Sequence, residues 1–149
     1  MDSSSNDAAR LSLVIEQLVR AFRPLTAGDP LSQAAAAVLS RLDTSGPRGV
    51  TGLARAERVT QPAMTQLVTR LHDEGLVSRE ASPTDRRSVV VSLTERGRDA
   101  LADRRARRAE HVAEALAGVE TADQRAIFAA LPGLENFVRA AQQLENASE

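Results

Sequence analysis

The sequence predicts a mainly α-helical protein that carries one small β-wing. Two observations predict this fold class. Apolar residues recur at steps of three and four in the first and last thirds of the chain, which is the spacing of amphipathic helices. Residues 76–93 hold two short runs of strand-forming residues on either side of a polar loop. The 149 residues suit a single domain or one subunit of an oligomer.

Composition excludes several classes of protein. The chain contains no Cys, which excludes disulfide scaffolds, thiolate zinc sites and thiol redox sensors. All 19 basic residues are Arg, so chemistry that needs a lysine is excluded as well. No apolar run approaches the ~20 residues of a membrane span, and residues 1–10 carry no signal-peptide core. We therefore expect a cytoplasmic protein with no cofactor, no metal and no membrane contact.

The formal net charge of −1 conceals an uneven distribution. Counting Arg against Asp and Glu gives −1 for residues 1–47, +3 for residues 48–98 and −3 for residues 99–149. A basic middle third is a weak signature of nucleic-acid binding. A solvated protein face produces the same imbalance, so charge alone does not decide.

The N-terminal part is expected to contain a tail and one helix. Residues 1–9, rich in Ser, Asp and Ala, are predicted to be a disordered tail. Residues 10–28 contain an amphipathic helix that ends at Pro24. Such a helix cannot bury its apolar stripe inside so small a core without a partner. The stripe consists of Leu11, Val14, Ile15, Leu18, Val19 and Phe22.

Residues 29–97 are predicted to contain three helices followed by a ribbon. We expect a helix from its N-cap Ser32 to about residue 42, and then a loop to residue 49. A short helix over residues 50–57 follows, with Thr51 as its N-cap. After a tight turn, Thr60 caps a longer helix that ends at Gly75. This order is typical of a helix–turn–helix, and the strands that follow would form its wing.

Residues 98–149 are predicted to be helical. Thr94 is expected to cap a long helix. Thr121 begins the last helix, and Gln124 completes a capping box with it. Pro132 and Gly133 lie inside the apolar pattern of this helix, and we expect them to kink or break it.

The second helix of the helix–turn–helix has an outward face suited to reading DNA bases. With Met64, Leu67, Val68 and Leu71 inward, the outward side chains are mostly short hydrogen-bonding groups. Gln pairs with adenine, Arg pairs with guanine, and Ala or Thr methyls contact thymine, while N–H groups at the helix start suit a phosphate. An ordinary exposed helix face is the alternative. The candidate DNA-binding residues here are Thr60, Gln61, Pro62, Ala63, Thr65, Gln66, Thr69 and Arg70.

The loop between the two predicted strands is the second candidate site. Arg86 and Arg87 at its tip can enter a narrow minor groove, which attracts guanidinium groups. Asp85 can orient Arg87 through a paired hydrogen bond. The alternative is a solvated turn in which Asp85 forms an Asx-turn.

Two further groups of charged residues have structural explanations. Four Arg within residues 104–108 wrap most of a helix circumference, so we expect them to be solvated or paired with Asp103, Glu110 and the acidic C-terminal third. His111 beside Glu114 is simpler to interpret as an exposed helical residue than as a metal ligand. The chain has no phosphate loop and no catalytic motif, so we expect no enzymatic activity.

Several motifs in this order resemble the MarR family of bacterial transcriptional regulators. They are LVTRLHDEGLVSRE from residue 67, TDRRS from residue 84 and VSLTERG from residue 91. The combination is specific, although each motif alone is not. The resemblance covers residues 10–145 in helix order. It implies a winged helix-turn-helix with N- and C-terminal dimerisation helices, in a homodimer that reads a palindromic operator in double-stranded DNA.

The resemblance also implies roles for individual residues. Arg87 would enter the minor groove, and Asp85 would orient it. Many members of this family are released from DNA by small aromatic or phenolic ligands, so such a molecule is the candidate effector here. The chain has only three Phe and no Trp or Tyr to line a pocket, and it lacks the Cys of peroxide-sensing members. The expected dimerisation residues are Leu11, Val14, Ile15, Leu18, Phe22, Phe128 and Phe137.

The leading hypothesis is therefore a dimeric, sequence-specific repressor of a palindromic operator. Whether a small ligand releases it stays open at this point. The alternatives are an architectural DNA-binding module and a protein-interaction module, both without ligand control. Discrete palindromic protection in a footprint distinguishes the first hypothesis from diffuse architectural binding.

Overall fold

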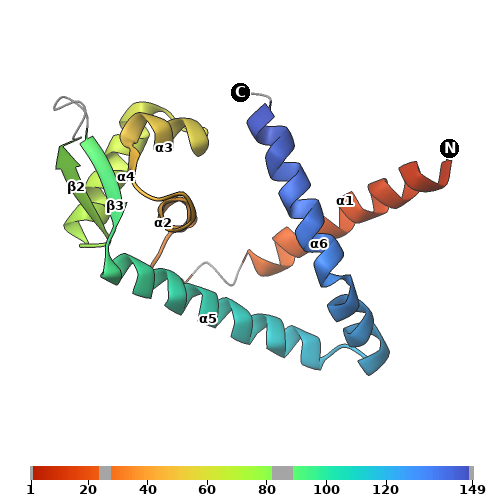
Figure 1. The fold of residues 1–149 in the computed structure, drawn as a ribbon. Coiled ribbons are helices and arrows are strands. Elements are labelled where there is room, and N and C mark those ends of the chain that lie inside the picture. The colour runs from red at the N-terminus through yellow and green to blue at the C-terminus, as the bar shows by residue number, and fades with distance from the viewer. Residues whose placement is uncertain (1, 24–27, 82–88, 148–149) are drawn as a thin grey trace. The chain divides into compact units, whose positions relative to one another are not determined.

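The computed structural model describes residues 2–23, 28–81 and 89–147 (Figure 1). The mainly helical fold with a small β-wing is confirmed. The chain divides into two compact units, Met1–Arg108 and Ala109–Glu149, which are described separately. In chain order the elements are α1 (Asp2–Phe22), α2 (Gln33–Ser45), β1 (Arg48–Gly49), α3 (Val50–Ala56), α4 (Gln61–Asp73), β2 (Val77–Ala81), β3 (Val89–Leu93), α5 (Glu95–Ala117) and α6 (Thr121–Ala147).

The first unit contains the helix–turn–helix and its wing. α3 packs against α4, α2 packs against β3, and β2 and β3 form an antiparallel ribbon (Figure 1). The sheet has three strands in the order β1-β3-β2. Val77 lies opposite Leu93 at one end of the ribbon, and Ala81 lies opposite Val89 at the other.

Strand β1 corrects the sequence prediction, which placed a loop from residue 43 to residue 49. α2 continues to Ser45, and Thr44 Oγ1 donates to the carbonyl of Ser40 at 3.0 Å in its last turn. Gly46 then turns the chain with a φ of 75°, and β1 pairs with β3. A strand of two residues is too short to show a periodicity in the sequence. The sequence also does not show that its partner is β3, which lies far along the chain.

The start and end of α4 are confirmed. Thr60 Oγ1 accepts from the N–H of Ala63 at 3.4 Å, and Gly75 has a φ of 74°, the left-handed conformation that ends a helix. Ser32 is confirmed as the cap of α2, because its Oγ accepts from the N–H of Ala35 at 3.2 Å. These signals are local, which is why the sequence reveals them.

Thr51 is wrong as an N-cap. α3 begins at Val50, and Gly49 occupies the cap position without a side-chain hydrogen bond. The physical reason is that β1 runs directly into α3, so Thr51 already lies inside the first turn.

The apolar core of the first unit fixes α4 by one face. α4 contributes Met64, Val68 and Leu71, none of which exposes more than 1% of its surface. Interlocked side chains of this kind resist rotation of the helix, so its opposite face is held outward. Other fully buried core residues are Val38 and Leu39 from α2, Leu53 from α3, Val77 from β2, Val91 from β3 and Leu101 from α5.

The start of α5 is fastened to the end of α4. Thr94 caps α5 as predicted, because its Oγ1 accepts from the N–H of Gly97 at 3.1 Å. The same hydroxyl donates to the carbonyl of Gly75 at 2.7 Å. Gly97 lies so close to Leu76 that an added Cβ would collide with the Leu76 carbonyl oxygen. The wing and α5 therefore join the helix–turn–helix through a junction without spare room.

Both terminal helices differ in extent from the sequence prediction. α1 begins at Asp2, so residues 2–9 are helical and not a disordered tail. These residues contain no Gly or Pro that would stop a helix. α6 continues through Pro132 to Ala147, so of the predicted kink or break the break is wrong, and the kink stays a prediction. A proline removes one backbone donor, and a helix of 27 residues retains the others.

The predicted capping box of α6 is also wrong. The N–H of Gln124 donates to the carbonyl of Glu120 at 2.9 Å, so Glu120 stands at the cap position that the prediction gave to Thr121. The Gln124 side chain reaches the other way and donates to the carbonyls of Leu116 at 3.0 Å and Val119 at 2.8 Å. The Gln124 side chain therefore closes the turn between α5 and α6, and its amide does not cap the start of α6.

Candidate nucleic-acid interface

The outward face of α4 is the main candidate interface. All the sequence-predicted residues of this helix and its cap, from Thr60 to Arg70, are exposed, while Met64 and Val68 between them are buried. One side of α4 is therefore apolar and packed in the core, and the opposite side is polar and exposed. That outward side presents amides, hydroxyls, methyls and one guanidinium, which are the groups that read base edges.

Two threonines on this face use their hydroxyl protons internally. Thr65 Oγ1 donates to the carbonyl of Gln61, and Thr69 Oγ1 donates to the carbonyl of Thr65, both at 2.9 Å. Such bonds to the preceding turn are a known alternative for Thr inside helices. The sequence predicts these residues to be hydrogen-bonding groups, and in the structure the one proton of each hydroxyl is already donated to the backbone.

Arg79 on β2 belongs to the same surface and carries no predicted role. Its Nη1 donates to Thr69 Oγ1 at 3.4 Å, which connects the wing to α4. Arg79 lies within one of the motifs that carry the family resemblance, but its contact with α4 depends on how the ribbon folds back. Sequence spacing alone does not show that contact.

The start of α4 offers fewer backbone donors than expected. Pro62 has no N–H, and the N–H of Ala63 is bonded to Thr60. These two positions therefore present no donor to a phosphate, which weakens the expected role of this helix N-terminus. The side chains of the face have to supply the recognition.

The predicted wing-tip residues Asp85, Arg86 and Arg87 lie outside the described residues. The strands on either side of them, β2 and β3, pair in register up to Ala81 and Val89. The two strands predicted on either side of the loop are thus confirmed, and the roles of the loop's side chains stay predictions.

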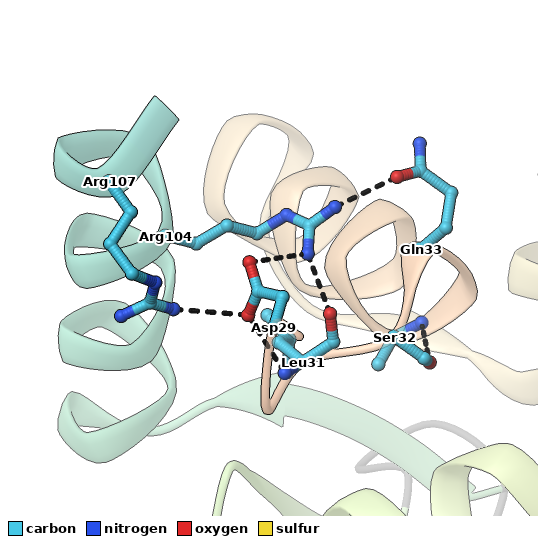
Figure 2. Close-up of polar contacts among 7 residues, drawn as sticks. Asp29, Leu31, Ser32, Gln33, Arg104 and Arg107 are labelled. Atoms are coloured by element: carbon cyan, nitrogen blue, oxygen red, sulfur yellow. Dashed lines mark hydrogen bonds and ion pairs between the residues drawn. The ribbon is translucent and has the colours of Figure 1, made fainter. Parts of the chain in front are cut away.

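The arginine row of α5 differs from its predicted surroundings (Figure 2). Arg104 is 4% exposed, and its Nη1 lies 2.9 Å from Asp29 Oδ2 and donates to the Leu31 carbonyl at 2.6 Å. Its Nη2 donates to Gln33 Oε1 at 2.8 Å. Arg107 Nη2 binds the other oxygen of Asp29 at 3.0 Å. The expected partners Asp103 and Glu110 are therefore wrong for these two residues, whose partners lie more than seventy positions earlier in the chain.

Asp29 is the anion at the centre of this cluster. Burial of its carboxylate acts to raise the pKa. The hydrogen bond from the N–H of Leu31 and the charges of Arg104 and Arg107 act in the opposite direction. Together they prevail, so the pKa of Asp29 lies below its ordinary value and the residue stays ionised. The cluster holds α5 against the segment that leads into α2.

Two further charged pairs lie at the surface. Arg105 Nη2 lies 3.2 Å from Asp43 Oδ2, and His111 Nδ1 lies 3.5 Å from Glu114 Oε2. Within residues 2–23, 28–81 and 89–147, no group of three or more His, Asp or Glu is placed to hold a metal ion. In the same part of the chain, none of the helices combines the length and the hydropathy needed to cross a bilayer.

A groove in the first unit lies between the segment before α2, the end of α4 and the first half of α5. Its volume is about 390 Å³. Its lining includes apolar side chains as well as groups of both charges. The apolar residues are Pro30, Leu31, Leu76 and Ala100, the acidic residues are Glu74, Asp99 and Asp103, and the basic residues are Arg96 and Arg107. The groove is large enough for one small organic molecule.

Known proteins are similar to this chain in sequence and in fold. A profile of the MarR family matches residues 31–89. An uncharacterised HTH-type transcriptional regulator of Mycobacterium bovis is 34% identical over 124 residues, which cover 83% of this chain and 87% of that protein. A putative transcriptional regulator from Pseudomonas aeruginosa has a crystal structure with a TM-score of 0.75 and 28% identity, covering 93% of this chain and 97% of that one. A mutant MarR from E. coli shows the same fold, with a TM-score of 0.68 and 22% identity over 88% of this chain and 95% of that one.

Proposed function

Because the chain belongs to the MarR family of DNA-binding transcriptional regulators, we propose that it acts as a homodimeric repressor of a palindromic operator. Its relatives are regulators and not enzymes. The observation that carries the proposal is the division of α4 into a core-locked apolar face and an exposed face of base-reading groups. The site of action is the cytoplasm, where bacterial DNA lies.

The exposed side chains of α4 would enter the major groove. Gln61 and Gln66 suit bidentate contact with adenine, and Arg70 suits guanine. Thr60, Pro62 and Ala63 would pass closest to the backbone at the start of the helix. At the wing tip, Arg86 and Arg87 would reach the adjacent minor groove, with Asp85 orienting Arg87.

The apolar stripes of α1 and α6 support a homodimer. Every described side chain of α1 from Ser5 to Ala21 is exposed, although six large apolar residues are among them. α6 similarly leaves Phe128 and Phe137 about half exposed, at 52% and 48%. Apolar surface of this extent on a chain marks an interface. The residues proposed for it are Leu11, Val14, Ile15, Leu18, Phe22, Phe128 and Phe137.

Release from DNA by a small aromatic or phenolic effector completes the proposal. The groove beside α5 supports it, because its volume suits one such molecule and it adjoins both the end of α4 and the Asp29 cluster. A ligand seated there would contact α5 and the turn that positions α4. Calorimetric titration with a panel of small aromatic acids tests this part.

The main test is selection of bound genomic fragments, followed by footprinting and mobility shifts at moderate salt. We expect discrete, palindromic protection, and about tenfold weaker binding or more for Arg70→Ala and Arg87→Ala with unchanged melting temperatures. Arg98→Ala, an exposed arginine on α5, is the matched control and should bind as the wild type does. Diffuse protection would instead favour the architectural module. Absence of any shift, together with salt-insensitive protein binding, would favour the protein-interaction module.

A further inference from the structure

Thr65 and Thr69 lie one helical turn apart in the middle of the exposed face of α4. A threonine hydroxyl has a single proton to donate. In both residues that proton is directed to a backbone carbonyl of the preceding turn, at 2.9 Å. Neither side chain therefore has a donor left for a base edge.

The orientation of the hydroxyl determines what each threonine presents outward. Oγ1 and Cγ2 occupy different staggered positions on the same Cβ. When the hydroxyl points back to the preceding turn, the methyl therefore points in a different direction from the hydroxyl. For Thr69 the oxygen is engaged twice, because it also accepts from Arg79 Nη1 at 3.4 Å. Thr69 therefore has no donor left for a base, its oxygen is held by two partners, and its methyl is the group that we expect to meet DNA.

We propose that Thr65 and Thr69 recognise thymine through contacts between methyl groups, and that Arg79 is the positioning residue that holds Thr69 for this contact. Thymine is the base that displays a methyl group in the major groove. Four residues of helix span about 6 Å, or about two base-pair steps, so each operator half-site would carry two closely spaced thymines. This inference rests on the proposed function, since it needs α4 in the major groove.

The decisive experiment compares two replacements at each threonine on the selected operator. Thr65→Val and Thr69→Val replace the hydroxyl by a second methyl. Val carries a methyl at both γ positions, so a methyl faces the base even where the contact of Thr69 with Arg79 is lost, and binding should stay within about twofold of wild type. Thr65→Ser and Thr69→Ser keep the hydroxyl and remove the methyl, so binding should weaken about fourfold for each. The opposite order, with Val weaker than Ser, would overturn the proposal.

The matching change on the DNA replaces operator thymines one at a time by uracil, which lacks only the methyl. Wild-type protein should lose about fourfold at two thymines per half-site. The loss at one of them should disappear in Thr65→Ser and the loss at the other in Thr69→Ser, because the contact is already gone. A uracil scan without any loss, on an operator that Arg70→Ala binds about tenfold more weakly or worse, would overturn methyl recognition and leave the proposed function intact. An absence of specific DNA binding by the wild type would overturn both.

Arg79→Met tests the positioning role while retaining an unbranched side chain. Its readout is the ratio of affinities for thymine and uracil at the position assigned to Thr69. The ratio should fall toward one at that position and stay unchanged at the position assigned to Thr65. An unchanged ratio at both positions would show that Arg79 does not orient Thr69, whatever happens to overall affinity.

Discussion

The winged helix and the two terminal helices use apolar residues in opposite ways. In the winged helix, Leu39, Leu53 and Val91 are fully buried by the same chain. In α1 and α6, Val19 is 67% exposed and Phe128 is 52% exposed. The first pattern stabilises a single chain, and the second can be satisfied only by another surface. The winged helix therefore buries its apolar residues within the chain, whereas α1 and α6 leave theirs available for the proposed dimer interface.

The largest effect should come from a charge placed in the α1 stripe. We expect Leu18→Asp to yield monomers and to weaken operator binding by about a hundredfold or more, because two linked half-site contacts become one. Sedimentation and mobility shifts measure the two effects. Gln17→Asp adds the same charge outside the stripe and should remain dimeric. A Leu18→Asp protein that stays dimeric with wild-type affinity would remove α1 from the interface.

A large effect on the winged helix should follow from Asp29→Asn. The change leaves Arg104 buried without its counter-charge, so we expect a loss of about 3 kcal/mol in the free energy of unfolding, measured with urea. Asp43→Asn is the matched control, because its pair with Arg105 is exposed and should contribute less than about 1 kcal/mol. Equal losses in the two variants would contradict a special role for burial.

The same residue predicts a pH dependence. The pKa of Asp29 is lower in the folded state than in the unfolded state, so its stabilisation is fully present above the ordinary value of 3.8. That stabilisation is lost as the pH falls through the lowered folded-state pKa. The wild type should therefore lose its advantage over Asp29→Asn in acid, and urea titrations at successive pH values should show the two curves converging.

A smaller effect is expected at the junction of wing and α5. In Gly97→Ala the new Cβ would meet the Leu76 carbonyl and lie 2.6 Å from Leu93 Cδ1, so we expect a loss of about 2 kcal/mol. Gly52→Ala adds the same atom in α3, where nothing lies within 4 Å, and should stabilise by about 0.5 kcal/mol. Thermal or urea unfolding of the pair gives the comparison directly. Equal stabilities would mean that the junction accommodates the added Cβ without a loss of unfolding free energy.

The smallest effect concerns the cap of α2. Ser32→Ala removes the acceptor of the Ala35 N–H and should cost about 1 kcal/mol of unfolding free energy. Ser40→Ala, inside the same helix, should be neutral or slightly stabilising because Ala is the better helix former. A loss at Ser40 as large as that at Ser32 would indicate a general effect of removing hydroxyls.

What the sequence predicts well is local. The cap at Thr60, the turn at Gly75 and the inward row of α4 each depend on residues a few positions apart, and each is confirmed. β1 escapes such reasoning because its two residues are a strand only when β3 lies beside them. The error at Thr51 has the same origin, since it is β1 that moves the cap to Gly49.

The candidate site shows the same division. Exposure of the α4 face follows from its helical period, and the sequence identifies it. The partners of Arg104 and the contact of Arg79 with Thr69 depend on tertiary structure. The inward direction of the threonine hydroxyls could be predicted only in part. A Thr inside a helix often bonds to a carbonyl of the preceding turn, but this bond competes with other hydrogen-bond partners.

The inward-turned hydroxyls of α4 have a consequence for the temperature dependence of DNA binding. The hydroxyl protons of Thr65 and Thr69 are bonded to the backbone of α4, so in the proposed complex it is their methyls that would be dehydrated on meeting thymine. Association through such groups lowers the heat capacity and strengthens on warming, whereas contacts with phosphates respond mainly to salt. For a regulator built this way, temperature and ionic strength would act on two separable parts of operator binding, the reading of bases and the hold on the backbone.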